Sequence, residues 1–264
     1  MERREFLAAS AAGAVSLGTK GVHLPDPMPE PRFQAATRKI LIGGGGFGPP
    51  FIRYMATLTG KARPRLCYLP TASADGLDGV VRWYRSCALL DVTPFDQESF
   101  ISSYSMDRTW EEAFLSMDGI VVSGGNTLNQ QAIWRAQGID RVLRQAWDRG
   151  IVLGGASAGS LCWFEEGTTD SRPKVLTKVE CLGFLKGSHS PHYDGEEQRR
   201  PTYHRLIASG ELKPGYAVDN EAGIYFEGEE VRRVVATREG AKAYWVHLVG
   251  GQVIEDVLEP ELIA

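Results

Sequence analysis

The 264-residue sequence lacks the features that mark nucleic-acid-binding, membrane-spanning and metal-binding proteins. It has no run of basic residues, and its net charge of -4 argues against nucleic acid as the main partner. No apolar stretch approaches the length of a membrane span. The four cysteines have neither metal-site nor CxxC spacing, and Cys67 and Cys162 stand in apolar contexts that indicate core thiols. We therefore expect no metal and no cofactor.

The N-terminal residues resemble an export signal. Arg3 and Arg4 precede a mild apolar run over residues 8–17, as in a twin-arginine signal, and a proline-rich stretch follows. We predict a signal region over residues 1–20, a linker over 21–38 and one folded domain over 39–264. The corresponding location is periplasmic or extracellular, with a cytoplasmic protein as the alternative.

Strand and helix patterns alternate through the first two thirds of the folded region. The apolar strand patterns are Lys39–Ile42, Leu66–Leu69, Val92–Phe95, Gly119–Val122 and the stretch from Ile151. This alternation predicts an α/β fold with a doubly wound, mostly parallel sheet flanked by helices. Short strand patterns after Tyr216 predict antiparallel strands at the C-terminal edge, and no internal repeat or second domain is visible.

Four loops follow predicted strands and should meet at one edge of the sheet, because ligands of such sheets bind beyond the carboxyl ends of the strands. They are Gly43–Gly48, Thr71–Asp75, Ser123–Thr127 and the turn at Ser157. The first is glycine-rich but lacks the Lys-Ser/Thr pair of a P-loop. Two prolines then stand where a dinucleotide fold would have its last glycine, so we interpret the loop as a tight turn at the mouth of a pocket.

The turn Gly155-Ala-Ser-Ala-Gly159 joins an apolar strand to a helical run. It matches the G-x-S-x-G nucleophile elbow, in which a sharp turn raises a serine hydroxyl above the sheet. Small flanking residues let the strand and helix approach, and the helix N-terminus directs N–H groups at a developing oxyanion. A glycine-rich strand-to-helix turn without catalytic duty is the alternative.

A serine nucleophile needs an imidazole to take its proton. Of the five histidines, only His189 and His192 stand on a loop after the parallel unit. In an α/β-hydrolase the catalytic residues follow one another along the chain as serine, acid and histidine, with the histidine usually near the C-terminus. In this sequence most candidates for the catalytic acid come after His192. This order disfavours a lipase or esterase of that fold.

Between Lys39 and Tyr244 the sequence contains four motifs that occur in the same order in a known protein family. They are Ser123–Thr127, the elbow with Ser160, Gly167–Ser171, and Pro191–Asp194 with Glu197–Arg199. Together they resemble the peptidase E family of serine peptidases (family S51), which includes aspartyl dipeptidases and cyanophycinases. The resemblance implies a class I glutamine amidotransferase-like fold and no cofactor. It also implies a small peptide as substrate.

The resemblance assigns roles to residues of this chain. It implies Ser157 as nucleophile and His192 as general base, with main-chain N–H groups of Gly125 or Asn126 and of Ala158 as the oxyanion hole. Arg199 matches a family arginine that implies binding of an acidic substrate.

The third catalytic residue stays open, because the family pattern and this sequence diverge there. The turn Asp219-Asn220-Glu221 offers Glu221, which we prefer, Asp219, or an Asn220 amide as in cysteine proteases. Asp170 is a further alternative from the Thr-Thr-Asp turn.

We therefore expect a serine peptidase that hydrolyses Asp-X dipeptides or related β-aspartyl bonds as a monomer or homodimer. The alternatives are a catalytically silent binding protein of the same fold and a cyanophycinase-type hydrolase of β-aspartyl-arginine bonds. No partnership with nucleic acid or, in the mature form, with a membrane is expected.

Overall fold

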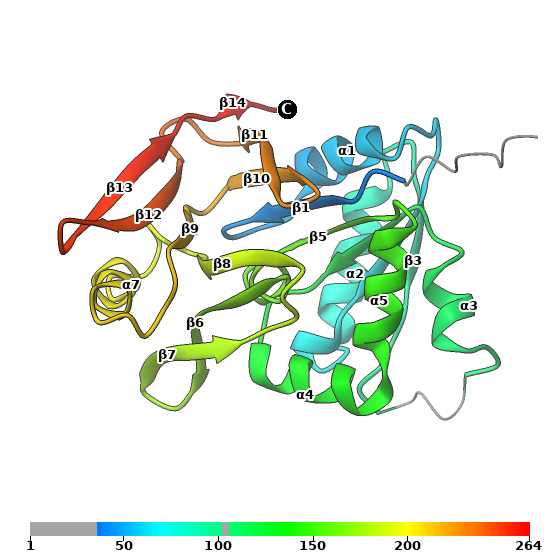
Figure 1. Cartoon of the computed structure of the whole chain (residues 1–264). Helices are drawn as coiled ribbons and strands as arrows, with labels where there is room; N and C mark the ends of the chain where they lie inside the picture. The colour runs from blue at the N-terminus through cyan, green and yellow to red at the C-terminus, as the bar shows by residue number, and fades with distance from the viewer. Residues whose placement is uncertain (1–35, 102–105) are drawn as a thin grey trace, which may run out of the picture. The chain divides into compact units, whose positions relative to one another are not determined.

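The computed structural model describes residues 36–101 and 106–264, shown in Figure 1. The predicted signal region and the linker up to residue 35 lie outside the described residues. In the described ranges no helix is both long and apolar enough to span a bilayer. The helical elements are α1 (Pro49–Leu58), η1 (Thr71–Ser73), α2 (Leu77–Cys87), α3 (Trp110–Phe114), α4 (Thr127–Gln137), α5 (Ile139–Asp148), α6 (Ala158–Leu161) and α7 (Arg199–Ala208).

The larger sheet has eight strands in the order β14-β11-β10-β1-β5-β4-β2-β3. Strands β1, β5, β4, β2 and β3 are parallel, whereas β10 runs antiparallel to β1 and β11 antiparallel to β10. The predicted α/β class, with a parallel sheet and antiparallel strands added later in the chain, is confirmed. Its strands are β1 (Lys39–Gly43), β2 (Arg65–Leu69), β3 (Thr93–Asp96), β4 (Gly119–Val122), β5 (Val152–Ala156), β10 (Ala222–Glu227), β11 (Glu230–Ala236) and β14 (Glu261–Leu262).

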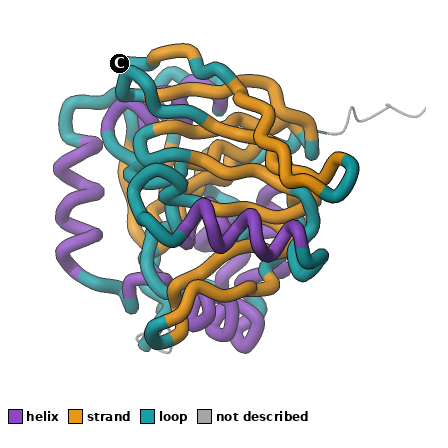
Figure 2. Tube along the Cα trace, turned by 90° about the vertical axis from the view of Figure 1, so that its left-hand side faces the viewer, coloured by secondary structure: helices purple, strands orange, loops and turns teal. Residues whose placement is uncertain are grey.

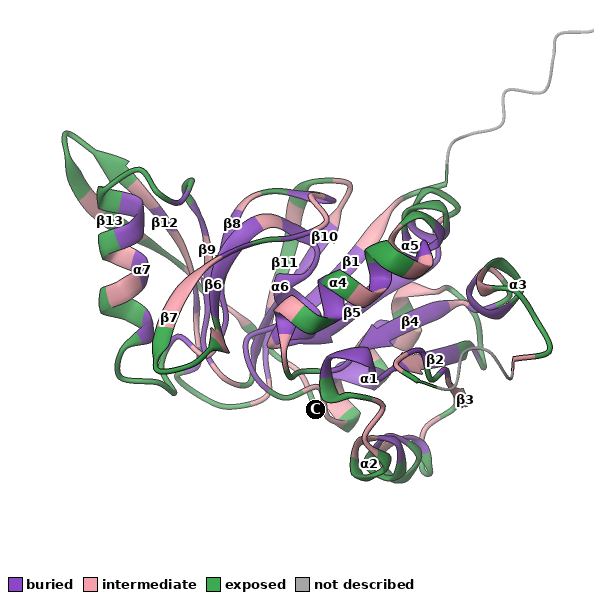
Figure 3. Cartoon of the chain, turned by 90° about the horizontal axis from the view of Figure 1, so that it is seen from below, coloured by how far each residue is buried: buried purple, intermediate pink, exposed green. Residues whose placement is uncertain are grey.

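Strands β4 and β5 are buried at every position, as expected for the centre of a parallel sheet with both faces covered. One apolar cluster joins α1 and α2 to one face of the sheet, and another joins α3, α4 and α5 to the opposite face. Figure 3 shows the two helix layers on either side of buried strands. Gly138 separates α4 from α5, because this glycine adopts the left-handed φ of 74° that ends a helix.

A second sheet of six strands, ordered β13-β12-β9-β8-β6-β7, was not predicted. The segment Thr168–Asp170, expected as a polar turn, lies inside strand β6. Helix α7 packs on β12 and β13, and Figure 2 shows it lying across the front of the strands. The strands are β6 (Phe164–Arg172), β7 (Val175–Glu180), β8 (Leu185–Ser190), β9 (Gly215–Val218), β12 (Ala243–Val249) and β13 (Gln252–Leu258).

Candidate active site

Ser157 stands alone between β5 and α6 with φ 60° and ψ −121°. A non-glycine residue at positive φ is strained, and such strain gathers at active sites. Within residues 151–160 only Ser157 is partly exposed, whereas its neighbours are buried. The elbow therefore presents one hydroxyl to solvent at the carboxyl end of the central strand.

The two glycines of the elbow allow it to press against strand β4. A Cβ atom at Gly155 would lie 2.4 Å from the Val122 carbonyl oxygen, and one at Gly159 would lie 2.1 Å from the same atom. Both distances are far below van der Waals contact. The G-x-S-x-G spacing thus meets a packing requirement of this fold.

The glycine-rich loop after β1 connects the catalytic candidates. The Gly43 carbonyl accepts a long hydrogen bond from the Ser157 N–H at 3.4 Å, and the Gly44 carbonyl accepts one from the His192 N–H at 3.2 Å. Gly45 forms a β-bridge with Asn220. Three successive glycines therefore hold segments from β5, β8 and β9 beside one another. The sequence suggested a tight turn here, and the structure adds this positioning role.

The imidazole of His192 is oriented by an amide. Its Nδ1 lies 2.7 Å from Asn220 Oδ1, and this oxygen can only accept, so Nδ1 carries the proton and Nε2 is free to act as a base. Asp194 accepts the Asn220 N–H at 2.7 Å, and Arg238 donates to the Asn220 carbonyl at 3.2 Å. Asn220, one of the alternatives to the preferred Glu221, is the residue placed against His192.

The three carboxylates proposed as the third catalytic residue do not contact His192. Glu221 is exposed and pairs with Arg238 at 3.0 Å. Asp219 is buried and accepts the N–H of Lys242 at 2.9 Å. Asp170, with 67% of its side chain exposed, lies 3.8 Å from Arg199. In the described residues none of the three forms a hydrogen bond with His192, because Asn220 occupies that side of the ring.

The N–H groups near Ser157 differ in availability. The Asn126 N–H donates to the Ala72 carbonyl at 2.8 Å, and its side chain caps α4 by accepting the Asn129 N–H at 2.9 Å. The N–H groups of Gly125 and Ala158 have no acceptor within the described ranges. Of the predicted oxyanion donors, Gly125 and Ala158 are therefore free, whereas Asn126 is engaged.

Arg199, predicted to bind substrate, is only 2% exposed. Its Nε donates to Glu196 at 2.8 Å, and one terminal nitrogen donates to the Thr168 carbonyl at 3.1 Å. These contacts join the start of α7 to strand β6. The guanidinium of Arg199 therefore forms its hydrogen bonds with other residues of the protein, and these bonds explain why it is buried there.

A hydrogen-bonded pair of a serine and a histidine, Ser160 and His189, lies beneath the elbow. Nε2 of His189 is 2.9 Å from the Ser160 hydroxyl, and its Nδ1 is 2.9 Å from the Tyr216 carbonyl. Both residues are fully buried, so no substrate reaches this serine. The sequence placed His189 on a loop, whereas it lies buried within strand β8. Burial lowers the pKa of His189 to about 3, and the ring stays neutral.

The buried imidazole predicts acid sensitivity. Its pKa of about 3 in the folded state lies below the ordinary 6.5, so the unfolded chain binds the extra proton. The stabilisation is complete above pH 6.5 and is lost as the pH falls towards 3, at about 1.4 kcal/mol per unit. Urea unfolding between pH 7 and 4 should show this slope, and His189→Gln should remove it. An unchanged slope in the variant would assign the sensitivity to other groups.

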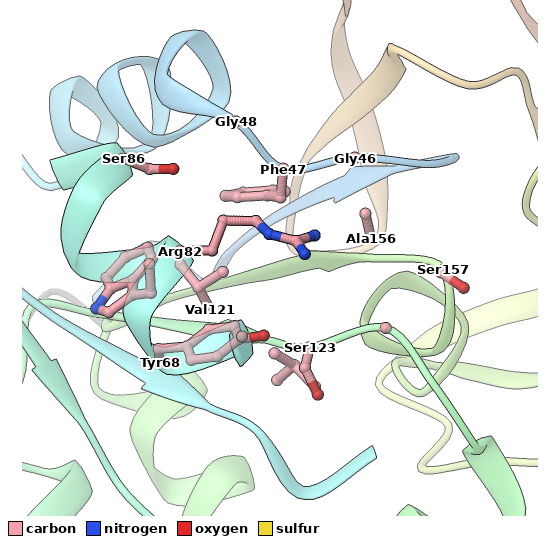
Figure 4. Close-up of a pocket in the computed structure, with 14 residues that line it drawn as sticks. Gly46, Phe47, Gly48, Tyr68, Arg82, Ser86, Val121, Ser123, Ala156 and Ser157 are labelled. Carbon is pink, nitrogen blue, oxygen red and sulfur yellow. The ribbon is translucent and has the colours of Figure 1, made fainter. Parts of the chain in front are cut away.

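A cavity of about 350 Å³ opens beside the nucleophile. Figure 4 shows Ser157 at its edge and Arg82 extending across it from α2. The Gly46–Gly48 segment forms another part of the wall, as the sequence suggested for a loop at the mouth of a pocket. The described ranges contain no group of three His, Cys, Asp or Glu side chains able to hold a metal ion. The described residues thus bring together a candidate nucleophile at the edge of a cavity, a histidine oriented by an amide, and two N–H groups without an acceptor.

Comparisons with known proteins identify the family of the chain. The model of peptidase family S51 matches residues 40–234. The chain is 42% identical over 222 residues to the uncharacterized peptidase YgaJ of Bacillus subtilis (strain 168), covering 82% of this chain and 94% of that protein.

Two solved structures share the fold. One is a peptidase from an acI-B1 Actinobacterium (TM-score 0.69, 15% identity, 88% of this chain and 98% of that one). The other is a peptidase E protein from Listeria monocytogenes EGD-e (TM-score 0.56, 17% identity, 75% and 98%). The predicted family is confirmed: this chain belongs to peptidase family S51 and is a serine-type peptidase.

Proposed function

We propose that the enzyme hydrolyses short peptides, Asp-X dipeptides or related β-aspartyl bonds, through an acyl-enzyme on Ser157. His192 takes the hydroxyl proton through Nε2 and returns it to the leaving amine. The Gly125 and Ala158 N–H groups stabilise the oxyanion. The observation that carries the proposal is the loop Gly43–Gly45, which contacts Ser157, His192 and Asn220 in succession.

Asn220 takes the place of the triad acid in this proposal. An amide oxygen fixes the tautomer and ring orientation, as an aspartate does, but brings no negative charge to the imidazolium. The short contact between Nδ1 and Oδ1, at 2.7 Å, supports this role over those of Glu221 and Asp170.

Rates of dipeptide cleavage distinguish the proposed peptidase from the two alternative functions. The purified protein should cleave Asp-X or β-Asp-X dipeptides faster than Ala-X dipeptides of the same leaving residue. A catalytically silent binding protein would cleave none of them, and a cyanophycinase-type enzyme would prefer β-aspartyl-arginine bonds. EDTA should leave the rate unchanged. Failure to cleave every member of the panel, together with no labelling by a serine-directed fluorophosphonate, would contradict the proposal.

Replacing Gly45 with alanine should reduce kcat while preserving the fold. The new Cβ would lie 1.9 Å from Asn220 Oδ1 and 2.7 Å from His192 Nδ1. The amide can swing away, which relieves the clash but releases the imidazole. A misplaced catalytic group costs on the order of 100-fold in rate. Kinetics and thermal unfolding of Gly45→Ala check this, and wild-type kcat in a folded variant would contradict the loop's positioning role.

We also propose export by the twin-arginine route, supported by Arg3 and Arg4 ahead of the apolar run. Exchanging both arginines for lysine should retain the protein in the cytoplasm, as fractionation would show. A native protein whose N-terminus is still Met1 would refute processing by this route.

A further inference from the structure

The cavity beside Ser157 contains a cation without a partner. Arg82 lines this cavity, and among the described residues no carboxylate lies within ion-pair distance of it. By contrast, Arg199, Arg200 and Arg238 all pair with carboxylates. None of the residues that line the cavity is acidic. An unpaired guanidinium in a cavity with no acid suits an anionic ligand.

The hydroxyl groups of Ser123 and Tyr68 are among those that line the same cavity. Ser123 is 3% exposed, and its Oγ has no hydrogen-bond partner among the described residues. A buried hydroxyl without a protein partner is available to donate to a ligand that enters the cavity. Burial raises the pKa of Tyr68, against the opposing effects of the nearby Ser123 hydroxyl and the Arg82 charge, so its phenol stays a donor. Arg82, Ser123 and Tyr68 thus supply donors to one space.

The cavity is continuous with the reacting serine. Ala156, Ser157 and Gly124 form one wall of it, and a Cβ at Gly124 would lie 3.2 Å from Ser157 Cβ. An acyl group bound to Ser157 therefore extends directly into the cavity. In an α-aspartyl substrate the free carboxylate is separated from the scissile carbonyl by two carbon atoms. In a β-aspartyl substrate the spacing is the same, so one pocket can serve both.

We propose that Arg82, with the Ser123 and Tyr68 hydroxyls, binds the free carboxylate of the substrate's acyl group and determines the preference for aspartyl substrates. This inference rests on the proposed function and deepens it. It transfers the specificity role from Arg199, whose guanidinium is buried and paired with Glu196. Arg82 belongs to α2, which lies away from α7 in the fold (Figures 1 and 3), and its side chain extends across the cavity (Figure 4).

The test compares Asp-p-nitroanilide with its neutral isostere Asn-p-nitroanilide. Neither leaving group carries a carboxylate, so the acyl side chain alone is probed. Arg82→Gln should lower kcat/KM for the aspartyl substrate about 10- to 100-fold, the value of a charged hydrogen bond, and change it little for the asparaginyl one. Arg85→Gln is the matched control, since Arg85 lies one turn along α2 and does not line this cavity. Its specificity should equal that of the wild type.

Equal losses on both substrates would remove Arg82 from acyl-group selection. A loss on Asp-Leu that is absent on Asp-p-nitroanilide would show that Arg82 binds the C-terminal carboxylate instead, which overturns the proposal. A binding measurement needs no turnover: calorimetry should show L-aspartate binding wild type more tightly than L-asparagine, and Arg82→Gln losing that difference. If the wild type cleaved no substrate but kept this difference, the proposed function would fail and the carboxylate site would stand. Equal binding of both amino acids to wild type and variant would refute the site.

Discussion

Replacing Ser157 with alanine should abolish turnover and leave the fold intact. Loss of a catalytic serine costs on the order of a millionfold in rate. Alanine keeps the Cβ atom that causes the strain at φ 60°, so the strain stays the same and the free energy of unfolding should change little. Steady-state kinetics and thermal unfolding of the purified variant provide the measurement.

Ser160→Ala is the matched control, because Ser160 is a second serine close to the elbow and its hydroxyl contacts a histidine, His189. Its removal leaves His189 Nε2 without that hydrogen bond, which should cost about 1–3 kcal/mol of stability. Turnover should persist because both residues are buried away from solvent. If Ser157→Ala kept more than a few per cent of the wild-type activity and Ser160→Ala lost it, Ser160 rather than Ser157 would be the nucleophile.

Asn220→Ala should give the second-largest loss. Without Oδ1 the imidazole loses its tautomer preference and its orientation, and disturbance of this partner in serine proteases reduces kcat by up to about 10⁴-fold. KM should change little, because Asn220 does not line the cavity. Glu221→Ala should keep most of the wild-type kcat, since its carboxylate pairs with Arg238 at 3.0 Å. Rates for both variants at saturating substrate give the comparison.

The variant Asn220→Asp tests whether an acceptor for Nδ1 of His192 is what the reaction needs at this position. A carboxylate retains the acceptor for Nδ1, so this variant should recover much of the rate lost in Asn220→Ala. The prediction fails if Asn220→Ala keeps near-normal kcat while Glu221→Ala, Asp219→Ala or Asp170→Ala loses it. That outcome would restore a carboxylate as the third catalytic member.

The parallel sheet and the elbow could be predicted from sequence because their signals are local. Fully apolar strands such as Gly119–Val122 are distinctive, and the glycines at 155 and 159 mark a turn whose packing requires them. The six-stranded sheet gave a weaker signal. Strand β6 reads Phe-Glu-Glu-Gly-Thr-Thr-Asp-Ser-Arg, which lacks the apolar pattern of a strand although four of its successive residues are buried. Pairing with β7 and β8, rather than propensity, places it in a sheet.

The site was less predictable where it depends on contacts between distant segments. The turn at residues 219–221 offered adjacent polar side chains, and only the β-bridge between Gly45 and Asn220 selects which one faces His192. Arg82 gave no sequence signal, because an arginine on an amphipathic helix is ordinarily a solvated one. His189 and His192 were correctly grouped on one segment, yet strand β8 buries the first and ends before the second.

The most direct measurement is the identity of the acylated residue. The enzyme can be mixed with excess Asp-p-nitroanilide or an aspartyl ester, quenched in acid during turnover and digested for mass spectrometry. We expect one aspartyl group on the peptide that contains residues 151–164, with fragmentation placing it on Ser157. An adduct on Ser160 or on a residue of another peptide would show that Ser157 is not the nucleophile.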